Sequence, residues 1–149
     1  MRKKPTLLSI LFVLMVSICF AQKKTPLTII SGKVSISQYH EKEDLETLPK
    51  GRLLTLYRER IEVIVKILPN IAFATKPGVT MASLGIPDTK EHRKALEKNI
   101  EASNSYFDST IEFQNKVLPY SDKSNLIAAI LFYEDTLKSL HTYSEFNRI

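Results

Sequence analysis

Three stretches of the chain space apolar residues three and four positions apart, and this spacing constrains the fold more than any other feature. The first stretch is spaced 3, 4, 3, 4, 3 and comprises Leu54, Tyr57, Ile61, Ile64, Leu68 and Ile71. Such spacing keeps one seam of a helix facing a partner helix. We therefore predict a long helix that packs through this seam. Pro69 lies inside the pattern and removes a backbone hydrogen bond, so it either kinks the helix or ends it.

Two further helices are predicted. The stripe of the second comprises Leu96, Ile100, Ser103, Phe107, Ile111 and Leu118, with Ala95, Ala102, Tyr106, Phe113 and Val117 beside it. Asp88, followed by Glu91, has the pattern of a capping box and is predicted to cap this helix. The seam of the third comprises Leu126, Ile130, Tyr133, Leu137 and Leu140. Because residues 119–121 form a tight connection, we predict an all-α fold, an elongated antiparallel three-helix bundle.

The first 21 residues have the three zones of a secretory signal. A positive start at residues 2–4 precedes a nearly continuous apolar run at residues 7–20. This run is shorter than the roughly 20 residues that a helix needs to span a bilayer. An uncleaved N-terminal anchor is the alternative, and export is the prediction.

The predicted cleavage site lies between Ala21 and Gln22, because a small residue suits the position before the cut. Lipid attachment at Cys19 is disfavoured, since the bulky Ile18 precedes the cysteine. The expected division is a signal peptide (1–21), an N-terminal arm with a short acidic helix (22–48) and a helical bundle domain (49–149).

Removal of the signal changes the charge balance. Of 21 basic residues three lie in the signal, so 18 basic residues face 16 acidic ones in the remainder. The two signs are mixed, whereas nucleic-acid binders concentrate basic residues, so no nucleic-acid partner is expected. The single cysteine also leaves with the signal. An exported chain without disulfides fits a Gram-negative bacterial envelope, periplasmic or secreted, better than small disulfide-rich scaffolds.

The arm has a weaker pattern than the helices. Val34 and Ile36 alternate with serines, and Ser31-Gly32 can form a turn, which indicates a short β-hairpin. An isolated hairpin is marginal in water, so an extended or disordered segment is the alternative. Residues 41–48 are acidic and are predicted to form one or two helical turns before Pro49.

Known catalytic and metal-binding patterns are absent from the sequence. A di-iron bundle needs Glu three positions before His, whereas Ser37, Thr89 and Lys138 precede His40, His92 and His141 in this way. The sequence also lacks a Cys-x-x-Cys-His haem motif, a Gly-x-Ser-x-Gly elbow and a phosphate-binding loop. We expect no metal, no cofactor and no catalytic residues, and we expect His40 to be solvated.

Two groups of apolar residues exceed what the bundle needs. The connector at residues 75–87 carries Val79, Met81, Leu84 and Ile86, which either cover the core or form a binding loop; the cover is favoured. The third helix carries Ala128, Ala129, Leu131 and Phe132 outside its seam. Either residues 27–36 or a partner covers these, and the internal cover is favoured.

The leading hypothesis is an exported, non-catalytic helical protein that acts through protein–protein interaction in the cell envelope. Its partner is another protein or a second copy, and no stable membrane insertion of the mature chain is expected. The candidate interaction residues are Val79, Met81, Leu84, Ile86, Leu131 and Phe132. The alternative is a bundle that binds a small ligand or a metal and uses the 75–87 loop as a lid.

Overall fold

The computed structural model describes residues 26–147, with the side chains of residues 26–141. The signal peptide predicted for residues 1–21, its cleavage between Ala21 and Gln22, and lipid attachment at Cys19 lie outside the described residues. Within them the chain is all-α, as predicted, and contains no strand. None of the described helices combines the length and the apolarity that a bilayer crossing requires.

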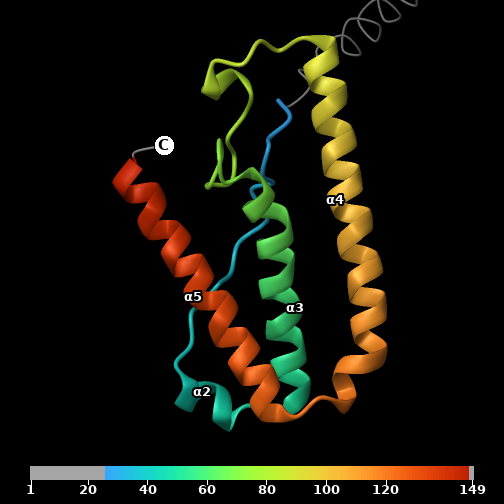
Figure 1. Cartoon of the computed structure of the whole chain (residues 1–149), viewed down its shortest axis with the longest axis vertical. Coiled ribbons are helices and arrows are strands. Elements are labelled where there is room, and N and C mark those ends of the chain that lie inside the picture. The colour runs from blue at the N-terminus through green and yellow to red at the C-terminus, as the bar shows by residue number, and fades with distance from the viewer. Residues whose placement is uncertain (1–25, 148–149) are drawn as a thin grey trace, which may run out of the picture.

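Four α-helices and three short 3₁₀ turns follow one another in the described part of the chain (Figure 1). The α-helices are α2 (Lys42–Thr47), α3 (Lys50–Ile67), α4 (Lys90–Val117) and α5 (Lys123–Asn147). The 3₁₀ turns are Leu68–Asn70, Ala82–Leu84 and Leu118–Tyr120. The predicted short acidic helix therefore exists as α2.

The best-packed part of the described chain is the contact between α3 and α5, which meet at the bottom of Figure 1 and splay apart toward its top. The buried seam of α3 comprises Leu53, Leu56, Arg60, Val63 and Ile67, and the first three are fully buried. The predicted seam lies one position further along the chain, and of its six residues only Ile61 is buried. That prediction was wrong because α3 is apolar on two adjacent sides, and a charged residue in the buried seam concealed which side faces inward.

The N-terminal segment (residues 26–41) joins the core instead of forming a hairpin. Thr28 forms an isolated bridge with Thr80 of the connector. The amide of Ile29 donates to the carbonyl of Val79 at 2.8 Å, and the amide of Gly78 donates to that of Ile30 at 3.1 Å. Because a lone hairpin is marginal, burial of Ile29, Ile30 and Val34 against the helices provides the stability that a hairpin lacks.

The helix α4 runs back along α3 and is much less enclosed (Figure 1). Leu96 is its one buried residue, and its predicted stripe is otherwise half-buried. The neighbouring apolar residues Ala95, Ala102, Tyr106, Phe113 and Val117 are all exposed. Since α4 packs mainly on α3, whereas α5 packs on α3 and α2, the predicted elongated antiparallel three-helix bundle is not confirmed.

Two helix ends settle local predictions. The α-helix α3 ends at Ile67, and Pro69 lies in the 3₁₀ turn that follows, so Pro69 ends the helix. The predicted cap at Asp88 is wrong: Thr89 is the N-cap of α4, and its Oγ1 accepts a hydrogen bond from the amide of His92 at 3.1 Å. Asp88 instead pairs with Arg93 Nε at 3.2 Å. Asp and Thr can both cap a helix, so the sequence does not decide between Asp88 and Thr89. The helix begins one position later than the pattern indicated.

Candidate functional site

A buried charged network joins α3, α5 and the N-terminal segment. The side chains of Arg60 and Glu134 are fully buried. Arg60 donates from Nε and Nη2 to Glu134 Oε1 at 3.0 and 2.7 Å. The amide of His40 donates to Glu134 Oε2 at 2.6 Å, and His40 Nδ1 lies 3.0 Å from Oε1. Arg60 also donates to the carbonyl of Gln38 at 2.6 Å and to Glu59 Oε2 at 2.8 Å.

The network keeps Glu134 ionised. Burial raises the pKa of this carboxyl group, but hydrogen bonds from the amide and ring of His40 and from Arg60, together with the charge of Arg60, outweigh burial. The net result is a pKa below the ordinary value of 4.5. Because both carboxylate oxygens already accept hydrogen bonds inside the core, Glu134 is placed to anchor the N-terminal segment and not to exchange protons with a substrate.

Sequence reasoning missed this network. His40 was predicted to be solvated, yet its side chain is only 11% exposed. The sequence does place both charged residues at buried seam positions. Arg60 and Glu134 each lie four residues after one buried apolar residue and three residues before another. A charged residue at a seam position usually indicates a helix face that turns to solvent, and only the tertiary structure shows that two such residues meet.

The described residues offer no metal centre. Within 26–141, no three His, Cys, Asp or Glu side chains form a group that could hold a metal ion. The ring of His92 contacts the carbonyl of Pro87, with 2.7 Å between Nδ1 and the oxygen. His40 is engaged by Glu134.

One flank of α4 carries an exposed apolar surface, which we call the α4 stripe: Ala102, Tyr106, Phe113 and Val117. Tyr106 is 63% exposed and Phe113 64% exposed. Beside Ala102 and Tyr106, a groove of about 420 Å³ runs between the two helices and is lined on the α3 side by Ile64, Val65, Leu68 and Pro69. The stripe is therefore continuous with an apolar groove.

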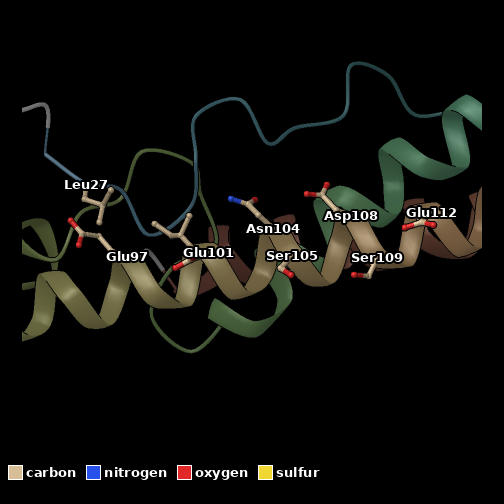
Figure 2. Close-up of a pocket in the computed structure, with 9 residues that line it drawn as sticks. Leu27, Glu97, Glu101, Asn104, Ser105, Asp108, Ser109 and Glu112 are labelled. Carbon is tan, nitrogen blue, oxygen red and sulfur yellow. The ribbon is translucent and has the colours of Figure 1, made fainter.

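The other flank of α4 is acidic. Glu97, Glu101, Asp108 and Glu112 project along it beside an open groove of about 610 Å³, which Leu27 closes at one end (Figure 2). Nearly all of the lining comes from this single helix, so the carboxylates are spread along one face and do not converge on one point. This arrangement is typical of a solvated helix face.

The predicted interaction residues are dispersed. Val79, Met81 and Leu84 are half-buried against the cluster that contains Ile30 and Val63. Ile86 is also half-buried. The connector thus lies over the core, as the favoured alternative predicted, and its binding role stays a prediction.

The two predicted residues on α5 differ from one another. Leu131 is half-buried and packs on the cluster around Leu45, whereas Phe132 is 67% exposed. The predicted cover of this region by residues 27–36 is wrong. Those residues pack against Val63 and Leu137 instead, and Phe132 and Ala128 stay exposed.

Compared with family models, curated proteins and solved structures, the chain matches none. The sequence-based candidates also omitted the α4 stripe, because Tyr106 and Phe113 were assigned to the sides of a packed helix. Their exposure on one flank of one helix is a feature of the described surface that folding alone does not explain.

Proposed function

We propose that this protein is an exported, non-catalytic helical protein that acts by binding another protein chain in the cell envelope. The observation that carries the proposal is the exposed α4 stripe. Export rests on the signal-like sequence of residues 1–21.

The stripe has the composition of a binding surface. Aromatic side chains contribute about 150–250 Å² each when they are fully buried, and they dominate the energetics of many interfaces. Tyr106 and Phe113 project about two-thirds of their surface into solvent from one helix. An isolated exposed apolar residue is ordinary, but several on one helix flank, with an apolar groove beside Ala102 and Tyr106, are typical of an interaction site.

The organisation of the fold supports the same function. The network of Arg60, Glu134 and His40, in which α4 takes no part, ties residues 38–40 to α3 and α5. Because the most enclosed core lies on that side, α4 is left with a free flank. A stable support that presents one helix flank suits a binding protein better than an enzyme, which needs convergent polar groups in a cavity.

Photo-crosslinking in the native envelope tests this function. A photoreactive residue at Phe113 is expected to give a covalent adduct with a protein chain, whereas the same residue at Glu101, on the acidic flank, is expected to give none. Both positions are exposed on the same helix, so they form a matched pair. Absence of an adduct at Phe113, or equal adducts at both positions, would contradict the proposal. Export is tested by cell fractionation and by sequencing the N-terminus of the mature protein. We expect the protein in the envelope fraction and Gln22 as its first residue.

Ligand binding is the second candidate, and a particular cavity favours it. A groove of about 460 Å³ lies between residues 27–34 and α4, and its polar lining includes Lys66, Asn70 and Asn99. The 75–87 loop does not line this groove, so residues 27–34 take the place of the predicted lid. Native mass spectrometry of protein from its host tests this alternative, with a retained small molecule as its expected result.

A further inference from the structure

We propose that the α4 stripe binds the α4 stripe of a second copy of this chain, as an antiparallel, two-fold symmetric helix pair. This pairing rests on the function proposed above, since it names the partner of the same surface. An isologous interface requires that a surface be complementary to itself. Spacing, side-chain size, area and charge all meet this requirement.

The stripe is symmetric in position. Tyr106 and Phe113 are equidistant from the midpoint between Ser109 and Thr110, and Ala102 and Val117 are equidistant from the same point. A two-fold axis through this midpoint would place Tyr106 level with Phe113 of the second copy. It would place Ala102 level with Val117 in the same way.

The stripe is also symmetric in size. The centre of the stripe has small hydroxyl residues, Ser109 and Thr110. On either side of them lies an aromatic ring, Tyr106 or Phe113. The outer positions hold a small apolar residue, Ala102 or Val117. Small side chains at the axis let two helices approach to the usual separation of about 8–10 Å. Each ring then packs beside a ring of the second copy in the offset manner that aromatic pairs prefer.

The exposed area of the stripe supplies about half of what a small dimer interface needs. With ring areas of about 150–250 Å², Tyr106, Phe113 and the 48%-exposed Val117 leave on the order of 300 Å² uncovered. Two copies together would remove about 600 Å², which is half of the roughly 1,200 Å² at the low end of specific interfaces. The flanks of the 28-residue helix and the groove at Ile64 and Leu68 can supply the remainder. We therefore expect a weak dimer whose population rises with protein concentration.

Charge selects this flank over the opposite one. The stripe contains no charged residue, whereas the acidic flank contains Glu97, Glu101, Asp108 and Glu112. At about 100° per residue, the two sets are separated by roughly 140° around the helix. Pairing through the stripe keeps the carboxylates of the two copies apart, and pairing through the acidic flank would oppose like charges.

Single cysteines test the geometry. Ser109 and Ser105 are both exposed on α4. In the proposed pair, two copies of Ser109→Cys lie beside the axis, whereas two copies of Ser105→Cys are about nine residues, or roughly 13 Å, apart along it. Disulfides need Cα atoms within about 7 Å. We expect mild oxidation to cross-link Ser109→Cys and not Ser105→Cys, with the unsubstituted processed chain, which lacks Cys19, as the cysteine-free control. Equal or reversed yields would overturn the antiparallel pair.

Light scattering coupled to size exclusion tests the dimer itself. We expect the processed chain to be a dimer, and the double variant Tyr106→Ser/Phe113→Ser to associate at least about tenfold more weakly. Phe132→Ser, an equally exposed ring on α5, is the matched control and should stay dimeric. Urea unfolding confirms that the variants are folded.

The outcomes separate this inference from the function on which it rests. A processed chain that is monomeric at every concentration overturns the dimer. If crosslinking at Phe113 still captures a different protein, the proposed function stands without the dimer. If Phe113 gives no adduct either, both proposals fail.

Discussion

The two sides of α3 are packed in very different ways. On one side, α5, α2 and the N-terminal segment fully enclose Leu53, Leu56 and the charged Arg60. On the other side, α4 has one buried residue, Leu96, among its 28 residues. The first side is enclosed along its length, whereas α4 joins the core mainly through Leu96, which shares a cluster with Val63 and Leu137.

The difference shows what periodicity can and cannot tell. The second predicted stripe is real, since its residues are the ones that turn toward α3. The apolar residues beside it, including Tyr106 and Phe113, look the same in the sequence and lie in solvent. A helical pattern identifies an apolar face, whereas the neighbours in space decide whether that face is covered.

The largest expected effect is on the complete side, at the buried ion pair. Glu134→Ala leaves the guanidinium of Arg60 buried without its carboxylate partner, so we expect a loss of about 3–5 kcal/mol in the free energy of unfolding. Urea denaturation measures it. The double variant Arg60→Met/Glu134→Leu is the control, because it removes both charges and should recover most of the loss. A loss below about 1 kcal/mol in Glu134→Ala would show that the pair does not hold this side together.

Acidification should weaken the same side. The pKa of Glu134 is below 4.5 in the folded chain and is expected near 4.5 in the unfolded chain. The unfolded state therefore binds the proton more tightly. The contribution of Glu134 to the free energy of unfolding is fully present above about pH 4.5. It is lost as the pH falls through the pKa of Glu134 in the folded chain. Urea midpoints followed from neutral pH downward should fall more steeply for the natural chain than for Glu134→Gln; parallel curves would contradict this assignment.

Matched core truncations compare the two sides directly. Ile130→Ala on α5 removes a fully buried side chain and is expected to cost about 2–5 kcal/mol. Ile111→Ala makes the same change at a half-buried position on α4, and we expect less than about 1.5 kcal/mol, because partly exposed atoms lose less on truncation. Equal losses in urea denaturation would mean that α4 is packed as tightly along its length as α5.

The sequence predicted the all-α class, the short helix α2, the three long helices and the stripe of α4 that turns toward α3. It misplaced the buried seam of α3, because Leu54–Leu68 is spaced as well as Leu53–Ile67 and lacks a charged residue. It could not locate the pairing of Thr28 with Thr80, since such contacts depend on distant segments. It missed the network for the same reason: Arg60 and Glu134 are 74 residues apart.

The smallest expected effect concerns the end of α4, where the helix must be stabilised by its own capping more than by tertiary contacts. Thr89→Ala removes the hydroxyl that accepts the amide of His92, and a lost N-cap costs about 1 kcal/mol. Asp88→Ala removes only the exposed pair with Arg93, which is expected to contribute less than about 0.5 kcal/mol.

Hydrogen exchange in the first turn of α4 would sharpen this comparison. If α4 opens independently of α5, Thr89→Ala should accelerate exchange near His92 and leave α5 amides unchanged. If the two sides of α3 unfold together, Thr89→Ala should accelerate the slowest amides of both helices by the same factor. The second result would show that the narrow contact of α4 with α3 is enough to couple the two sides.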